Sequence, residues 1–186
     1  MREVESKYLL TKEQYEKIRE DHQFVEQKYM TNHYYQTNSP DTLRLREESR
    51  KKDMELTYKR RLKQEGSVVE SLEITEAWIT DYAPDSISHK ELPTSIIEYL
   101  EESPSYQKEG CIRIARKVYI LDNLQVEFDI VELDLGVFFY ELEMESFNPR
   151  DHNHLRELLR EDYNITEAST KSKYQRFREH LEREAR

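Results

Sequence analysis

Charged and apolar side chains alternate along several segments of this chain, and this pattern limits the folds that it can adopt. The first segment places Glu3, Glu5 and Lys7 at alternate positions, with Val4 and Tyr8 on the other parity. Successive side chains of a β-strand point to opposite faces, so the three charged groups would share one face. The alternation recurs over residues 42–46, 54–61, 124–131 and 138–146. The sequence therefore predicts an antiparallel sheet with one apolar face and one charged face.

The charged face of this sheet has an unusual composition. A face in contact with solvent usually mixes several polar residue types, and for any one strand that is the simplest interpretation. Here the face carries arginine pairs and acidic pairs, namely Arg44 with Arg46, Glu127 with Asp129, and Glu141 with Glu143. A sheet that closes into a barrel turns one face inward. We therefore expect a charged tunnel inside a barrel, with the apolar side chains pointing outward against helices.

Four helices are expected beside the sheet. Thr11 and Gln14 form a capping box, which starts a helix that ends near His22. Tyr15 and Ile18 of this helix are expected to face the core. The other three helices are expected to start with a capping box of Ser95 and Glu98, with Asp151 as N-cap, and at Thr170. No repeat or linker divides the chain, so we expect a single α+β domain over residues 1–186.

Composition narrows the class of protein. The chain has 186 residues, a net charge of −10 and one cysteine. The lone Cys111 excludes an internal disulfide framework and a thiolate zinc site. The acidic balance disfavours duplex nucleic acid as a partner, and no apolar run reaches membrane length or resembles a signal peptide. We expect a cytoplasmic protein with no membrane partner, and outward-facing apolar residues leave a homodimer open.

A tunnel lined by both signs of charge suits a polyphosphate that is bound together with a divalent cation. Arginine binds phosphate through two parallel hydrogen bonds, and lysine acts as a compact charge. Carboxylate oxygens are ligands for Mg²⁺ or Mn²⁺, and such ions polarise a phosphoryl group and activate water. Phosphoryl transfer needs mainly positioning and charge neutralisation. The residues therefore indicate chemistry on a phosphate that needs no nucleophilic side chain.

The order of the motifs resembles a known family. Glu3-Val4-Glu5-Ser6-Lys7 is similar to the ExExK signature of the CYTH superfamily, also called the triphosphate tunnel metalloenzymes. Matching segments follow across nearly the whole chain: Tyr34-Tyr35-Gln36-Thr37, Leu43-Arg44-Leu45-Arg46, Leu56-Thr57-Tyr58-Lys59, Val126-Glu127-Phe128-Asp129, Glu141-Leu142-Glu143-Met144 and Thr170-Lys171-Ser172-Lys173. The small single-domain bacterial members are the most similar. The resemblance implies a closed eight-stranded antiparallel β-barrel with flanking helices and an open-ended tunnel.

The resemblance also implies roles for individual residues. Six carboxylates would form the metal site: Glu3, Glu5, Glu73, Asp129, Glu141 and Glu143. Six cations would hold the triphosphate: Arg44, Arg46, Lys59, Arg116, Lys171 and Lys173. Lys7 would contact a phosphate or, together with Tyr34, help to activate the attacking water. Strand alternation favours Glu73 over Glu70 as the inward residue, and the family pattern favours Arg116 over Arg113.

Members of this family include inorganic, thiamine and RNA triphosphatases and class IV adenylate cyclases. The expected function is therefore metal-dependent hydrolysis of a triphosphate, with inorganic tripolyphosphate as the first choice and a nucleoside or thiamine triphosphate next. Two alternatives stay open: a class IV-type adenylate cyclase, and a regulatory module that binds polyphosphate or nucleotide without hydrolysis. His33, His152 and His154 are expected at the surface rather than at a metal.

Overall fold

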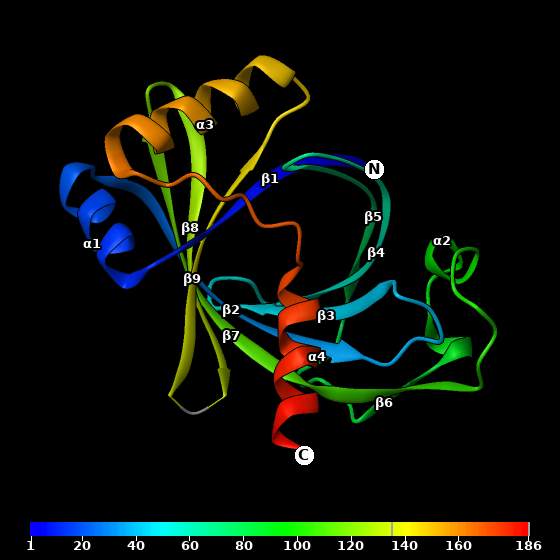
Figure 1. Cartoon of the computed structure of the whole chain (residues 1–186). Helices are drawn as coiled ribbons and strands as arrows, with labels where there is room; N and C mark the ends of the chain where they lie inside the picture. Colours follow the sequence, from blue (N-terminus) through cyan, green and yellow to red (C-terminus); the bar gives the residue numbers. More distant parts are fainter. Residues whose placement is uncertain (135, 186) are drawn as a thin grey trace.

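The computed structural model describes residues 1–134 and 136–185. The strands are β1 (Arg2–Leu10), β2 (Phe24–Tyr35), β3 (Thr42–Glu48), β4 (Met54–Glu65), β5 (Val68–Trp78), β6 (Ser86–Ser88), β7 (Ser105–Leu121), β8 (Leu124–Asp134) and β9 (Val137–Glu145) (Figure 1). The helices are α1 (Lys12–Asp21), α2 (Thr94–Ile97), α3 (Pro149–Tyr163) and α4 (Lys173–Glu184), with a 3₁₀ turn at His89–Glu91. None of the helices in these ranges is long and apolar enough to cross a membrane.

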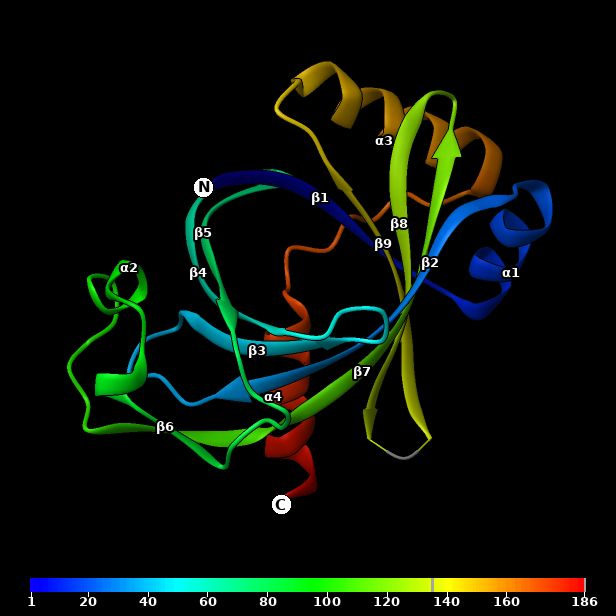
Figure 2. The same ribbon diagram turned by 180° about the vertical axis from the view of Figure 1, so that it is seen from behind.

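Eight strands close into an antiparallel barrel, which confirms the predicted architecture. Their order around the barrel is β2-β3-β4-β5-β1-β9-β8-β7, and pairing of β2 with β7 closes the ring. The short β6 is an additional strand that pairs with the start of β7. Figure 2 shows β4 and β5 curving from β3 toward the N-terminal end of β1.

Strand register brings charged residues of neighbouring strands together on the inner face. Lys7 of β1 lies opposite Glu143 of β9, and Arg116 of β7 lies opposite Asp129 of β8. Directly opposed residues of antiparallel strands have Cβ atoms about 5 Å apart, close enough for their side chains to interact. The charges that alternate along each strand therefore meet as ion pairs across strands.

One side of the barrel is covered by α1 and α3. These helices pack on the outward faces of β1, β7, β8 and β9 in a shared apolar cluster (Figure 1). Tyr15 and Ile18 of α1 are buried in this cluster, as predicted. The capping box of Thr11 and Gln14 is present, and α1 ends at Asp21, next to the predicted end. The alternation in the strands and the helix signals thus agree about which faces are apolar.

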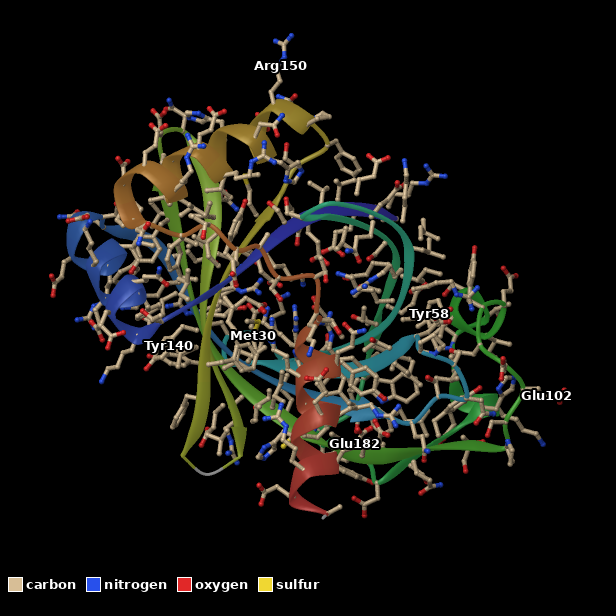
Figure 3. All side chains as sticks on the ribbon, viewed as in Figure 1. Met30, Tyr58, Glu102, Tyr140, Arg150 and Glu182 are labelled. Atoms are coloured by element: carbon tan, nitrogen blue, oxygen red, sulfur yellow. The ribbon has the colours of Figure 1, made fainter. Side chains whose placement is uncertain are left out.

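The segment from β6 to the start of β7 covers the outward faces of β3 and β4. Leu43, Leu45 and Leu56 are fully buried there against α2 and its neighbours. Figure 3 shows Tyr58 of β4 directed toward the α2 region, where its ring stacks on Tyr99 at a centroid distance of 5.9 Å. The apolar side chains of the barrel thus point outward, as the sequence predicts.

The predicted capping box of Ser95 and Glu98 is wrong. Pro93 takes the cap position of α2, and its fixed φ favours a helix start. Ser95 lies inside the helix, where its hydroxyl donates to Glu76 of β5 at 2.6 Å. Packing of α2 against β5 therefore outweighs the local capping signal.

The predicted N-cap of α3 is also wrong. Asn148 caps this helix by accepting a hydrogen bond from the N–H of Arg150 at 3.2 Å, and Pro149 is the first helical residue. Proline suits that position because it lacks an N–H and its φ is already helical. The carboxylate of Asp151 accepts instead from the Ser146 hydroxyl and the Asn148 amide.

Helix α4 starts at Lys173 rather than at Thr170, with Ser172 as its N-cap. Its apolar residues pack against the inner face of the sheet, where Phe177 stacks on Tyr34 of β2 with ring centroids 5.8 Å apart. Gly110 of β7 permits this approach, because a Cβ at that position would lie 2.6 Å from the Phe177 ring. The helix therefore covers one side of the barrel interior.

Two of the three histidines expected at the surface are buried. His152 of α3 is 5% exposed, and its Nδ1 lies 2.9 Å from the hydroxyl of Ser6 on β1. His33 of β2 is 8% exposed and lies 3.0 Å from Glu47. His154 is exposed, as expected. The burial of His152 follows from the earlier start of α3, which places this residue against β1 and β9.

Candidate functional site

The inner face of the barrel and the start of α4 enclose a polar cavity. It is lined by Glu3, Glu5, Lys7, Tyr34, Thr42, Arg44, Arg46, Thr57, Lys59, Glu73, Arg116, Glu143, Glu145, Ser172, Lys173 and Tyr174. Most of the site residues predicted from the sequence are therefore brought together. Asp129 and Glu141 lie directly behind this lining, in contact with Lys173.

One wall of the cavity carries two arginines that are poorly neutralised by the protein. Arg46 of β3 donates its Nε–H to Asn32 at 2.9 Å, and it forms no salt bridge with any residue in the described ranges. Among the residues that the structure describes, Arg44 has a single carboxylate within 4.0 Å, that of Glu73. Its buried Nε–H has no hydrogen-bond partner within the same residues. This pair, which we call the arginine wall, is a surface that an anion would neutralise.

The electrostatic cost of the arginine wall is visible at Arg46. Burial, together with the neighbouring guanidinium groups of Arg44 and Arg116, lowers the pKa of Arg46 to about 10. A lowered pKa of a cation means that its surroundings disfavour the charge. Three arginines share this region, so a multivalent anion suits it better than a single carboxylate.

Another part of the cavity lining combines carboxylates with lysines. Lys7 donates to Glu143 at 2.5 Å and also contacts Glu5 at 3.0 Å. Burial alone would lower the pKa of Lys7, but Glu143, Glu5 and Glu141 outweigh this effect and hold it well above its ordinary value. Lys7 therefore stays an ammonium group. Lys59 of β4 faces three carboxylates, those of Glu3, Glu5 and Glu73.

Three carboxylates form a buried floor, which we define as Asp129, Glu141 and Glu143. Arg116 binds both oxygens of Asp129 at 2.8 Å. Lys173 lies 3.0 Å from Asp129 and 2.8 Å from Glu143, and it also contacts Glu141. Burial raises the pKa of Glu141 to about 7 in spite of Lys173. A cation of the protein itself thus contacts all three floor carboxylates.

A second carboxylate group lies at the rim of the cavity, and we define it as Glu3, Glu73 and Glu145. Desolvation and a hydrogen bond with Glu3 raise the pKa of Glu145 to about 8. Two carboxyl groups that share a proton offer oxygens at a spacing suited to a cation. The side chains of Glu3 and Glu73 are 15% and 26% exposed, so an ion from solvent can reach them. The rim carboxylates are therefore more accessible to a divalent metal ion than those of the floor.

The floor has the compact geometry of a metal site. One carboxylate oxygen from each of the three floor residues lies within 4.8 Å of the others. The side chains of Asp129 and Glu141 are 0% exposed, however, and Lys173 occupies the space between the three carboxylates. A metal ion could enter only after this lysine had moved.

Tyr34 lines the cavity beside α4. Its ring lies 4.8 Å from that of Tyr174 and 5.8 Å from that of Phe177, so α4 fixes its orientation. The amide of Asn32 lies 3.5 Å from its hydroxyl. Tyr34 thus presents a rigidly held hydroxyl to the same cavity as Lys7.

Lys171 is the one predicted phosphate ligand that the structure places elsewhere. Its side chain is 52% exposed and pairs with Glu179 at 2.7 Å. Lys173, two residues later, is buried in the barrel. The difference follows from the helix start at Lys173, because the N-cap residue Ser172 turns the chain between the two lysines.

The structure places Arg116 and Glu73 on the inner face, as the family pattern favours for the first and strand alternation for the second. Arg113 is 62% exposed and faces Glu132, whereas Arg116 is 10% exposed and points into the cavity. Glu70 pairs with Arg2 outside the cavity at 3.2 Å, and Glu73 lines it.

Several residues at the site, among them Glu145, Glu127 and Tyr174, had no assigned role in the sequence prediction. Glu145 continues the inward alternation of Glu141 and Glu143 by one step, so the pattern itself could have identified it. Glu127 faces the cavity side and pairs with Arg116. Tyr174 has no comparable signal, because its position depends on how α4 docks.

Comparisons with known proteins agree with this architecture. The CYTH domain model matches residues 1–178, and no curated protein sequence matches the chain. Among solved structures, HpAC1 of Hippeastrum, described as an adenylyl cyclase candidate with a dominant triphosphatase activity, is 18% identical over 96% of each chain, with a TM-score of 0.72. The PH1819 protein of Pyrococcus horikoshii is 21% identical over 96% of this chain and 99% of its own, with a TM-score of 0.63.

An adenylate cyclase candidate from Bacillus halodurans is also similar. It is 16% identical over 94% of this chain and 96% of its own, with a TM-score of 0.63. At these identities the structural likeness supports the fold alone, whereas the family model covers nearly the whole sequence. The chain belongs to the CYTH domain family.

Proposed function

We propose that this protein is a triphosphatase that uses Mg²⁺ or Mn²⁺ and hydrolyses the terminal phosphoanhydride of a bound triphosphate. The observation that carries the proposal is the arginine wall, a pair of inward-facing guanidinium groups with little neutralisation by the protein. Carboxylates that a cation can reach face it across the same cavity. A triphosphate and its metal ion together match both walls in charge.

Binding of such a complex would exchange partners within the cavity. Lys59 now contacts Glu3, Glu5 and Glu73. With substrate present, it would turn to a phosphate beside Arg44 and Arg46, and the rim carboxylates would take the metal. The metal, when bound, polarises the phosphoryl group and lowers the pKa of a bound water. Arg116 would not only bind the substrate. It would also neutralise the floor carboxylates and hold Glu143 in place.

Lys7 is best suited to binding a phosphate. Its pKa is held above the ordinary value by the surrounding carboxylates, so it has no lone pair with which to accept a proton from water. The hydroxyl of Tyr34 is held rigidly in the same cavity, and we assign to it the orientation of the attacking water. Both residues thus act by position and charge, as phosphoryl transfer requires.

Inorganic tripolyphosphate is the substrate that we propose, with pyrophosphate and phosphate as products. The dominant triphosphatase activity described for HpAC1 supports hydrolysis of a triphosphate. The structural likeness to an adenylate cyclase candidate keeps cyclase activity as the second possibility. Production of cyclic AMP from ATP would identify it.

The test is a screen for phosphate release from tripolyphosphate, ATP and thiamine triphosphate with Mg²⁺ and with Mn²⁺. We expect release from tripolyphosphate, with loss of binding in Arg46→Ala. Arg113→Ala is the matched control, because Arg113 lies on the outer face of β7 and is 62% exposed. Folded protein that releases no phosphate from any of these compounds would refute the proposal. Tight binding by calorimetry without release would indicate a regulatory binding module instead.

A further inference from the structure

Asn32 of β2 is a buried amide on the inner face of the barrel, and it is 0% exposed. It lies directly opposite Arg46 of β3, and its Oδ1 accepts the Nε–H of Arg46 at 2.9 Å. The nitrogens of a guanidinium group only donate, so the oxygen of the amide must face Arg46. The NH₂ group of the amide therefore faces the hydroxyl of Tyr34, 3.5 Å away. One neutral side chain thus contacts both the arginine wall and the tyrosine beside it.

The hydrogen bond to Asn32 occupies only one of the five N–H groups of Arg46. Within the described residues, neither terminal nitrogen of Arg46 forms a hydrogen bond or a salt bridge, although the side chain lines the cavity. A guanidinium group is planar, so a bond at Nε also restricts the directions of the two terminal nitrogens. A ligand in the cavity would therefore meet donors that are already oriented, which lowers the entropic cost of binding.

Arg116 of β7 shows what a carboxylate does in the same relative position. It lies opposite Asp129 of β8, which binds its Nε and one terminal nitrogen at 2.8 Å each. Burial would lower the pKa of Arg116, but Asp129 and nearby glutamates outweigh it and hold the pKa well above its ordinary value. Arg46 faces an amide instead, and burial lowers its pKa to about 10. The amide thus holds an inward arginine without neutralising its charge.

The carboxylate on the other side of Arg46 is directed elsewhere. Glu55 of β4 lies opposite Arg46 in the pairing of β3 with β4. Its carboxylate pairs with Lys51 at 2.7 Å, and no salt bridge joins it to Arg46 in the part of the chain that the structure describes. Both strands beside Arg46 therefore leave its charge available to a ligand.

We propose that Asn32 is a positioning residue for the triphosphate, because its amide fixes the guanidinium of Arg46 and leaves the charge of that group for an anion. The identity of the anion rests on the proposed function. A carboxylate at position 32 would hold Arg46 in the same way but would neutralise it. An apolar side chain there would leave the charge of Arg46 but would not fix its orientation. Two substitutions therefore separate the two parts of this role.

The test is calorimetric titration with a non-hydrolysable imido analogue of tripolyphosphate in the presence of Mg²⁺. Asn32→Leu has a similar branched shape but accepts no hydrogen bond, and we expect it to weaken binding about tenfold. In an Arg46→Gln background the same change should weaken binding about twofold or less, because the group that Asn32 positions is absent. Asn153→Leu is the matched control, since the exposed Asn153 of α3 also accepts from an arginine, Arg156, at 2.8 Å.

Asn32→Asp tests the importance of a neutral side chain, and it decides the question if Asn32→Leu does not fold. The new carboxylate would face Arg46, with the guanidinium groups of Arg44 and Arg116 nearby. The melting temperature of the free protein should therefore be no lower than that of the unmodified protein, whereas binding of the analogue should weaken about tenfold or more. A residue that served only the fold would not lose binding in a variant as stable as the original.

Folded Asn32→Leu that binds the analogue as tightly as the unmodified protein would overturn the proposal, as would an equal loss of affinity with and without Arg46. Asn32→Asp with unchanged affinity or a lower melting temperature would also overturn it. Weaker binding in both variants, with no phosphate release from tripolyphosphate by the unmodified protein, would support the role of Asn32 and refute the hydrolysis in the proposed function. No binding of the analogue by the unmodified protein would refute both.

Discussion

Replacement of Arg46 by glutamine should stabilise the free protein and weaken its binding of triphosphate. The amide nitrogen of a glutamine stands the same number of bonds from the backbone as the Nε of arginine. It can therefore keep the hydrogen bond to Asn32, which Arg46 now donates at 2.9 Å. The change thus removes the charge and leaves the buried Asn32 with its partner.

The size of the stabilisation follows from the pKa of Arg46. Burial, Arg44 and Arg116 lower this pKa from 12.5 to about 10, which at full burial corresponds to about 3 kcal/mol. Partial exposure of the side chain reduces this to about 1 kcal/mol. A cation with a lowered pKa destabilises the fold at every pH below that pKa, so the cost is fully present at pH 7. Its removal should raise the melting temperature by about 2–4 °C.

The same substitution should stabilise the fold but weaken the binding of triphosphate. A charged hydrogen bond to phosphate contributes about 1.5–3 kcal/mol, so the KM for tripolyphosphate should rise by about 10- to 150-fold. Thermal unfolding and phosphate release measured on the same preparation give both numbers. Arg113→Gln, on the outer face, should change neither. A lower melting temperature with an unchanged KM would show that Arg46 serves the fold and would refute the arginine wall as an anion site.

Three further predictions concern the rim, the first strand and α4. The pKa of Glu145 is raised to about 8, so the native protein binds the carboxyl proton of Glu145 more tightly than the unfolded chain does, and the free energy of unfolding should fall as pH rises from about 5 to 8. Thermal unfolding of metal-free Glu145→Gln should show a smaller fall in stability over this pH range. An equal fall would contradict the Glu3–Glu145 pair. Deletion of residues 1–7 removes Glu3, Glu5 and Lys7 together with the pairing of β1 to β5. It should abolish phosphate release and broaden the unfolding transition, so retained activity would show that β1 is not part of the site. Gly110→Ala would place a Cβ 2.6 Å from the Phe177 ring and should lower the free energy of unfolding in urea by about 1–3 kcal/mol; no change would mean that α4 does not pack there.

The inner face of the barrel could be predicted because a strand fixes side-chain direction by parity alone. Arg44 and Arg46 were assigned inward for that reason, as was Glu73 in preference to Glu70. Closure of the sheet into eight strands came from the resemblance to the CYTH family and is confirmed by the pairing of β2 with β7. Alternation itself states which residues share a face but not whether that face is inside or outside.

Features that depend on helix docking could not be predicted from local pattern. Lys171 and Lys173 look equivalent in sequence, yet only Lys173 enters the barrel, because α4 starts there and packs on Tyr34. His152 resembles a polar residue at an exposed helix start, but α3 begins at Pro149 and turns it toward Ser6. In both cases tertiary packing shifts the start of the helix by two or three residues from the position that the local sequence predicts. That shift is enough to reverse the environment of a side chain.

The most direct test of the account is a crystal structure of the protein with tripolyphosphate and Mn²⁺, with the metal located by anomalous scattering. We expect phosphate oxygens within hydrogen-bonding distance of Arg44 and Arg46, and a Mn²⁺ ion at the rim carboxylates Glu3, Glu73 and Glu145. A triphosphate bound outside the barrel would contradict the proposed function. A Mn²⁺ ion held only by Asp129, Glu141 and Glu143, with Lys173 displaced, would contradict the proposed position of the metal at the rim.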